Sequence, residues 1–93
     1  MTYELEFVPS ALKEWKKLGH TVREQFKKKL GERLRAPRIQ ADALRELPDH
    51  YKIKLKASGY RLVYKVFDER VVVMVVAVGK RERSEVYLSA QKR

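Results

Sequence analysis

The sequence predicts a single α+β domain, in which an N-terminal strand and a helical hairpin pack on a small antiparallel β-sheet and a short C-terminal helix follows. Three observations predict this class: an alternating apolar segment near the N-terminus, two helix-periodic segments with a very short link, and three consecutive strand-like segments with short turns. The 93 residues are enough for one core but not for two, so we expect one domain over residues 1–93.

The first segment predicts a strand followed by a short helix. Tyr3, Leu5 and Phe7 alternate with glutamates, which is the period of a half-buried strand, and Pro9 is expected to end it. Gly19 is expected to stop the helix that follows. The apolar stripe of this helix consists of Ala11, Leu12, Trp15 and Leu18.

A second helix is predicted by a capping box, in which Thr21 and Glu24 precede an apolar stripe. Pro37 lies just past its end. The link between the helices is two or three residues, so the helices should pack antiparallel with both stripes toward the sheet. This second stripe consists of Val22, Phe26, Leu30 and Leu34.

Three consecutive lysines, Lys27, Lys28 and Lys29, lie in the second predicted helix. A run of this kind on a helix is usually a solvated face, and this is our main interpretation. The functional alternative is a contact with a large RNA surface.

The second half of the chain predicts an antiparallel meander. Residues 36–50 show no strong periodicity and contain two prolines, which indicates an irregular connection. Asp68 and Glu69 are expected to form the second turn of the meander. The uninterrupted apolar run Val71 to Val78 predicts a strand buried on both faces, covered by the helical hairpin and partly by the C-terminal segment. The three predicted strands are 51–57, 60–67 and 71–78.

Lysines occupy every second position of the first meander strand: Lys52, Lys54 and Lys56. A strand points alternate side chains to opposite faces, so these three should share one face. Tyr51, Ile53, Leu55 and Ala57 should share the other, and Tyr60 and Tyr64 of the next strand should join them in the core, together with Tyr3 and Trp15.

The pair Ser58-Gly59 predicts a two-residue turn after this strand, with Ala57 paired to Tyr60. That register would place Arg61 opposite Lys56, Val63 opposite Lys54 and Lys65 opposite Lys52. Two like-charge pairs would then face each other, which costs roughly 0.2 to 1 kcal/mol per pair if it mirrors the gain from opposite charges. A bound phosphate backbone would offset this cost.

Composition supports a polyanionic partner. Lys and Arg number 22 against 12 Asp and Glu, which gives a formal net charge of +10. Cysteine is absent, which excludes a disulfide framework, a zinc ribbon and thiol catalysis. The longest apolar run is far too short to span a bilayer, and the first residues show no secretory signal, so we expect a cytoplasmic protein with no membrane partner.

The sequence predicts neither a metal nor another cofactor. Asp42, Asp49 and Asp68 lie in separate connections without ligand-like spacing. His20 and His50 are thirty residues apart in different elements, so a paired-histidine mechanism would require folding to unite them.

RNA can be cleaved without a metal, because its ribose 2′-hydroxyl attacks the adjacent phosphate once a base removes the proton. A protein must then supply in-line orientation, positive charge around the transition state, and groups that accept and donate protons. Lysine, arginine and tyrosine can fill these roles, since neighbouring cations favour phenolate and neutral lysine. A cluster such as Lys52, Lys54, Arg61 and Arg81 would therefore suit phosphodiester cleavage.

The order of residues resembles the RelE toxins of bacterial type II toxin-antitoxin systems. The resemblance covers essentially the whole length and includes Lys-Ile-Lys-Leu-Lys, Ser-Gly-Tyr-Arg-Leu-Val-Tyr and Gly-Lys-Arg-Glu-Arg-Ser-Glu-Val-Tyr. It implies a RelE-like, microbial-ribonuclease-like α+β fold. It also implies an endoribonuclease that cleaves mRNA in the ribosomal A site without metal, leaving a 2′,3′-cyclic phosphate and a 5′-hydroxyl.

The same resemblance implies partners: a RelB-like antitoxin, the small-subunit rRNA of the ribosome, A-site mRNA, and operator DNA only together with the antitoxin. By this resemblance, Tyr87 matches the proposed general base and Arg81 the proposed acid or leaving-group stabiliser. The remaining matches are Lys52 and Lys54, which hold the phosphate, Arg61, which stabilises the transition state, and Arg45 and Arg83, which contact substrate. Lys56 is expected to bind RNA, and Lys56 and Lys65 are expected to form the electrostatic surround of this phosphate site.

Several alternatives remain open at the level of sequence. Some related toxins place a catalytic histidine near His50, whereas the RelE pattern relies on lysine, arginine and tyrosine. Tyr87 could instead pack its ring in the final helix. A toxin of the ParE branch would poison DNA gyrase and would not need the lysine, arginine and tyrosine set, and a non-catalytic RNA-binding or antitoxin-binding module would use only the basic face.

Overall fold

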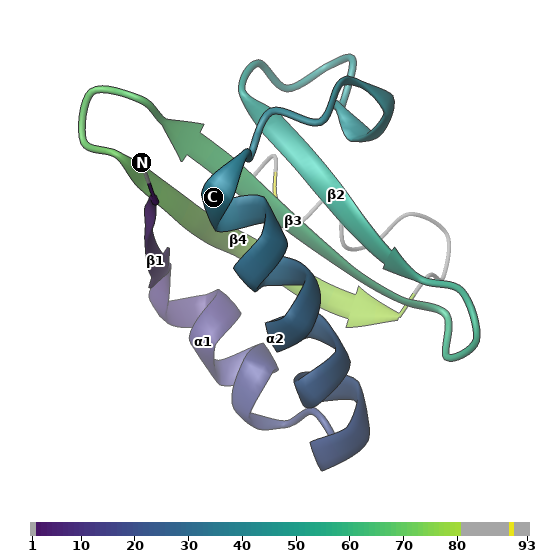
Figure 1. Ribbon diagram of the computed structural model, residues 1–93. Helices are drawn as coiled ribbons and strands as arrows, with labels where there is room; N and C mark the ends of the chain where they lie inside the picture. The colour runs from purple at the N-terminus through teal and green to yellow at the C-terminus, as the bar shows by residue number, and fades with distance from the viewer. Residues whose placement is uncertain (1, 81–89, 91–93) are drawn as a thin grey trace.

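A computed structural model describes residues 2–80 and Ala90, and it has the predicted α+β architecture (Figure 1). Helices α1 and α2 run antiparallel on one face of a four-stranded sheet, as predicted. Of the predicted C-terminal helix, all residues except Ala90 lie outside the described part. The elements are β1 (Glu4–Phe7), α1 (Pro9–Lys16), α2 (His20–Arg35), the 3-10 helix η1 (Gln40–Asp42), β2 (His50–Leu55), β3 (Tyr60–Phe67) and β4 (Val72–Lys80).

The strand order is β1-β4-β3-β2. Strands β2, β3 and β4 form the predicted antiparallel meander, and β3 has the predicted bounds. Strand β1 adds to the β4 edge in parallel orientation, because the helical hairpin returns the chain across the sheet before the meander begins. This order leaves β2 as an edge strand beside α2.

The core lies between the helices and the sheet. Trp15 packs between two tilted aromatic rings, with centroid distances of 5.2 Å to Phe7 and 6.2 Å to Phe26. The predicted tyrosines also belong here: Tyr51 and Tyr64 are buried, and Tyr3 and Tyr60 pack against the cluster while partly exposed. The predicted core positions of these tyrosines are therefore confirmed. The same prediction was wrong for Ala57, which lies exposed in the turn after β2, and for Leu5 and Leu12, which are exposed.

Strand β4 is buried on both faces, as its uninterrupted apolar sequence predicted. Val63 pairs with Ala77 and Tyr64 with Val75, so Val76 is an extra residue in β4 and forms a β-bulge. Val63, Val76, Ala77 and Ala90 form a second cluster separate from the main core.

The predicted register of the β2–β3 hairpin is wrong by two residues. Leu55, not Ala57, pairs with Tyr60, and Lys54 lies opposite Arg61. The turn has four residues because Gly59 adopts a positive φ of 76° and its N–H donates to the Leu55 carbonyl at 2.9 Å. Only one of the two predicted like-charge pairs therefore has a counterpart: Lys54 lies opposite Arg61 on the neighbouring strand, while Lys65 lies opposite His50.

The prediction of a capping box formed by Thr21 and Glu24 was also wrong. Helix α2 begins at His20 with Gly19 as its N-cap and no side-chain cap, so Thr21 lies inside the first turn. Glu24 instead pairs with Lys27 at 3.1 Å. The β3–β4 turn is longer than Asp68 and Glu69 alone, since β4 begins only at Val72.

Candidate functional site

A basic face lies on the side of the β2–β3 hairpin away from the helices. Tyr51, Ile53 and Leu55 of β2 belong to the core under the helices, so Lys52 and Lys54 point to the opposite side. The structure places Arg61 directly across from Lys54.

Lys54, Lys56 and Arg61 line one small cavity of about 280 Å³, together with Leu55 and Gly59. Two of the predicted catalytic cations, Lys54 and Arg61, and the predicted RNA-binding Lys56 therefore gather at the turn end of the hairpin. Their charges repel one another, so an anion bound between them would gain from all three at once.

Lys52 shares a second cavity, of about 690 Å³, with Arg45 and the η1 segment. The connection before β2 docks on that strand through a bridge between Ala43 and Tyr51 and a hydrogen bond from the Leu44 N–H to the His50 carbonyl at 3.0 Å. The connection thus brings Arg45 beside Lys52, although its sequence showed no periodicity that would predict this docking.

A hydrogen-bonded network behind Lys52 was missed by the sequence analysis. The Arg33 guanidinium on α2 donates to the Tyr64 hydroxyl at 2.9 Å and to the Lys52 carbonyl at 3.3 Å, and it pairs with Asp42 of η1 at 2.6 Å. The Tyr64 hydroxyl in turn donates to the Pro37 carbonyl at 2.6 Å. This network joins α2, η1, β2 and β3 directly behind the candidate phosphate-binding strand.

The pKa values within this network keep the Arg33 guanidinium charged and the Tyr64 hydroxyl protonated. Burial acts to lower the pKa of Arg33, but its hydrogen bonds to Tyr64 and Asp42 outweigh burial and raise it. Burial raises the pKa of Tyr64, against the opposing effect of Arg33, so the hydroxyl keeps its proton. A sequence signal did exist, because Arg33 follows Phe26 and Leu30 at helical spacing within the apolar stripe.

His50 shares the outer face of β2 with Lys52 and lies opposite Lys65. Its Nδ1 lies 2.8 Å from the Pro48 carbonyl oxygen, which can only accept, so Nδ1 carries a proton. In the neutral ring Nε2 is then the acceptor. Burial lowers the pKa of His50, and the nearby Lys65 cation lowers it further, against the Pro48 hydrogen bond.

We expect this shift to make the free energy of unfolding fall as the pH decreases through about 6.5. The unfolded chain protonates His50 at its ordinary pKa, whereas the folded imidazole resists protonation, so acid favours the unfolded state. Denaturant titrations between about pH 7.5 and pH 5.5 measure this slope. His50→Gln should flatten it, while the matched control His20→Gln at an exposed position should not; an unchanged slope in His50→Gln would contradict the assignment.

Arg81, Arg83 and Tyr87 lie outside the described residues. The last described residue before them, Lys80, pairs with Tyr60, and Gly79 pairs with Arg61. The predicted roles of Arg81, Arg83 and Tyr87 therefore stay predictions.

Within the described residues, no group of three or more His, Asp or Glu side chains could hold a metal ion. No helix within residues 2–80 is long and apolar enough to cross a membrane.

Comparison with known proteins identifies the family. The protein-family model described as the ParE toxin of type II toxin-antitoxin systems (parDE) matches residues 5–85. The chain belongs to this toxin family. It is 68% identical over 93 residues to the mRNA interferase toxin RelE of Escherichia coli K12, and the match covers all of this chain and 98% of that relative. The resemblance to RelE toxins read from the sequence is therefore confirmed.

Solved structures of RelE toxins confirm the fold of this family member. The R81A/R83A mutant of E. coli toxin RelE in the free state matches with a TM-score of 0.93 and 66% identity, over 100% of this chain and 98% of that one. The toxin fold within the intact E. coli RelBE toxin-antitoxin complex matches with a TM-score of 0.84 and 67% identity, over 87% of this chain and 99% of that one.

Proposed function

We propose that this toxin is an mRNA interferase, an endoribonuclease that cleaves mRNA in the ribosomal A site and so inhibits translation. The observation that carries the proposal is the basic face of the hairpin, where Lys54 and Arg61 lie opposite each other and Lys52 is the next outward-facing residue of β2. The full-length similarity to a protein named mRNA interferase toxin RelE supports the same activity.

The chemistry we propose is an attack by the 2′-oxygen on the adjacent phosphorus. The 2′-oxygen forms a bond to phosphorus, and the bond from phosphorus to the 5′-oxygen breaks, which leaves a 2′,3′-cyclic phosphate and a 5′-hydroxyl. Lys52, Lys54 and Arg61 neutralise the charge that gathers on the phosphate oxygens. Tyr87 accepts the proton of the 2′-hydroxyl, and Arg81 stabilises or protonates the leaving oxygen.

The flanking cations bind RNA rather than act on the reacting atoms. Arg45 lies beside Lys52, and Lys56 lies beside Lys54 and Arg61, so both extend the positive surface around the phosphate. Arg83 is proposed to contact substrate. His50 offers a neutral Nε2 on the same face and is a further candidate for proton transfer.

The partners we propose are the ribosome with its A-site mRNA and a RelB-like antitoxin. E. coli RelE, whose toxin fold this chain shares, has been solved in the intact RelBE complex. Operator DNA is proposed as a partner only of the toxin-antitoxin pair, which would repress its own transcription. We place the protein in the cytoplasm, where ribosomes and mRNA are found.

Ribosomes programmed with a defined A-site codon test the proposal. We expect the protein, stripped with EDTA and then freed of chelator, to cut the mRNA within that codon, and to leave the same mRNA intact when ribosomes are absent. Intact mRNA on programmed ribosomes would contradict the proposal. Gyrase-dependent DNA breakage by the same preparation would instead indicate the ParE-type activity.

A further inference from the structure

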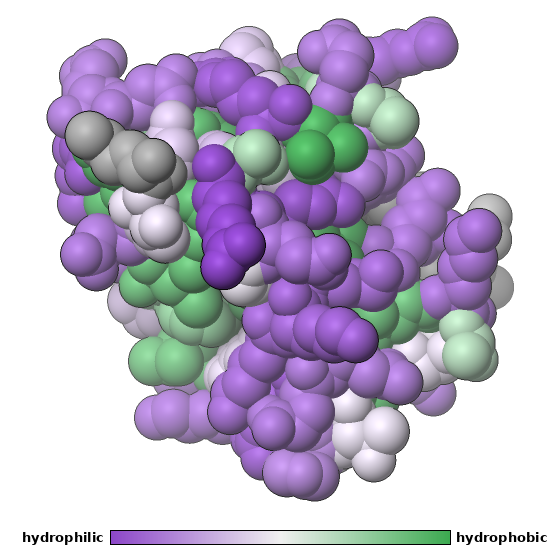
Figure 2. Space-filling model, viewed as in Figure 1, coloured by the Kyte–Doolittle hydropathy of each residue, from purple (hydrophilic) through white to green (hydrophobic). Residues whose placement is uncertain are grey.

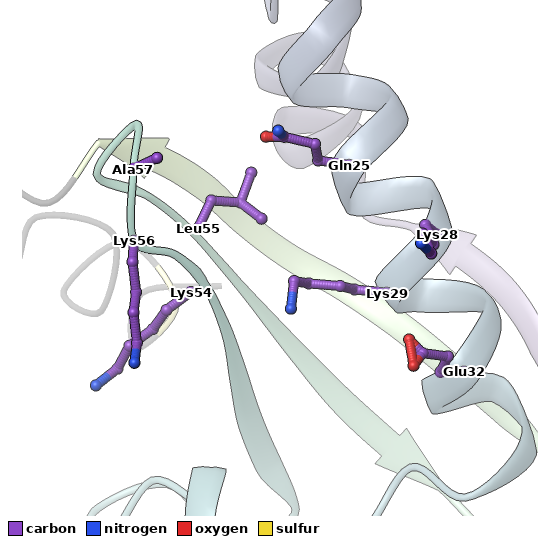
Figure 3. Close-up of a pocket in the computed structure, with 8 residues that line it drawn as sticks. All are labelled: Gln25, Lys28, Lys29, Glu32, Lys54, Leu55, Lys56 and Ala57. Atoms are coloured by element: carbon purple, nitrogen blue, oxygen red, sulfur yellow. The ribbon is translucent and has the colours of Figure 1, made fainter.

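A groove separates helix α2 from the turn end of strand β2. Positions 25, 28, 29 and 32 recur at helical spacing on one face of α2, and this face borders the β2 edge of the sheet. The groove has a volume of about 570 Å³. Its charged walls are Lys28, Lys29 and Glu32 on the helix and Lys54 and Lys56 on the hairpin, with Leu55 at its base (Figure 3).

Positive charge dominates this groove, with four lysines against one glutamate. Among the described residues, Lys28, Lys29 and Lys56 form no ion pair, whereas the neighbouring Lys27 pairs with Glu24. The solvated-face interpretation therefore suits Lys27, while Lys28 and Lys29 line the groove. In Figure 3, Lys29 extends from α2 toward the hairpin, and Lys54 and Lys56 extend together from the hairpin.

The groove is continuous with the candidate phosphate site. Lys54, Leu55 and Lys56 line both the groove and the smaller cavity that contains Arg61. Lys54 points away from the helices, so a single strand of RNA whose scissile phosphate lay at Lys54 and Arg61 would pass around the β2 edge to enter the groove.

The surface chemistry favours RNA over an acidic protein segment. Protein interfaces depend on apolar anchors in a desolvated centre, but Leu55 is only 6% exposed. The exposed large apolar residues of the described part are Leu5 and Leu12, on β1 and α1. Hydrophilic side chains cover most of α2 (Figure 2). Lysines without apolar anchors are typical of contacts to a phosphate backbone, which position a strand without reading its sequence.

We propose that this groove holds the phosphates of the substrate mRNA that flank the scissile one, through Lys28 and Lys29. The inference rests on the proposed nuclease function and deepens it. The lysines bind and orient the strand, and they do not touch the reacting atoms. Their removal should weaken substrate binding and leave the chemical step intact.

Single-turnover cleavage on programmed ribosomes tests this, with the toxin concentration varied to separate half-saturation from the maximal rate. We expect the double variant Lys28→Gln/Lys29→Gln to need roughly ten-fold more toxin for half-saturation, with a maximal rate within about two-fold of wild type. The slope of log affinity against log salt should fall by roughly 1.4, since each lost single-strand phosphate contact contributes about 0.7. An mRNA with uncharged methylphosphonate linkages on both sides of the scissile phosphate should abolish the difference between variant and wild type.

The matched control Lys13→Gln/Lys16→Gln removes the same charge from α1, which lies on the same face of the sheet but packs on β4 rather than beside the β2 edge. If this control needed as much additional toxin for half-saturation, the effect would come from the general electrostatic attraction of a basic protein to RNA, and the inference would be overturned. The inference would also be overturned if the Lys28→Gln/Lys29→Gln variant still needed more toxin than wild type on the uncharged mRNA, since the lysines would then contact ribosomal RNA. It would likewise be overturned if the variant cleaved like wild type and lost only antitoxin binding. If wild type itself leaves the mRNA intact, the proposed function fails and this inference fails with it.

Discussion

We expect Arg61→Ala to lower the single-turnover rate of A-site mRNA cleavage by about 10²- to 10³-fold. The guanidinium lies opposite Lys54 at the edge of the candidate phosphate site, where negative charge gathers on the phosphate oxygens during the reaction. The loss should appear in the maximal rate more than in half-saturation, because the interaction is stronger in the transition state. Arg61→Lys should recover part of the rate, since it keeps the charge but loses the planar donor pair.

Lys65→Ala is the matched control for this loss, because Lys65 lies on the same face of β3 but opposite His50. Its removal should slow cleavage by less than about three-fold, as expected for a charge outside the phosphate site whose long-range effect is screened by salt. Both variants should stay within about 1 kcal/mol of wild type in the free energy of unfolding, as measured by denaturant titration. Equal effects on the rate would contradict a specific role for Arg61.

Arg33→Ala should lower the free energy of unfolding by about 2 to 4 kcal/mol. The substitution leaves the Asp42 carboxylate without its cation and removes one partner each from the Tyr64 hydroxyl and the Lys52 carbonyl. The side chains of Arg33 and Asp42 are 16% and 27% exposed, so solvent replaces these contacts only in part. Arg33→Lys should recover only part of the stability, because one ammonium cannot reach three acceptors in this geometry.

Arg38→Ala is the control for Arg33, since Arg38 also forms ion pairs, in its case with two carboxylates, Asp49 and Asp68. The Arg38 side chain is 40% exposed, so its loss should cost less than about 1 kcal/mol. Denaturant unfolding of both variants side by side measures the difference. A similar cost for the two arginines would show that the Arg33 network adds no more than an exposed ion pair.

The elements of this fold could be predicted from the sequence because their apolar periods are clear. Strand β3 and the two-sided burial of β4 follow from apolar composition, and the tyrosine alternation assigned Tyr51 and Tyr64 to the core. The hairpin register could not be predicted in this way. It depends on whether the turn has two residues, Ser58 and Gly59, or four, residues 56–59, and a hydrogen bond from the Gly59 N–H to the Leu55 carbonyl closes the four-residue turn.

The candidate site was predictable only in part. Alternation alone placed Lys52 and Lys54 on one face, but the wrong register placed Lys56 rather than Lys54 opposite Arg61. The proximity of Arg45 to Lys52 depends on how an aperiodic connection folds onto an edge strand. The roles of Arg81, Arg83 and Tyr87 come from the family resemblance and lie outside the described residues.

The most direct test of cleavage by the 2′-hydroxyl removes that oxygen atom from the substrate. Programmed ribosomes receive an mRNA with a 2′-deoxyribose at the nucleotide that precedes the scissile phosphate, and the cleavage products are compared with those of the all-ribose mRNA. Attack by the 2′-hydroxyl predicts a 2′,3′-cyclic phosphate from the ribose form and no cleavage of the deoxy form. Cleavage of the deoxy form at a comparable rate would show that water is the nucleophile and would contradict the account.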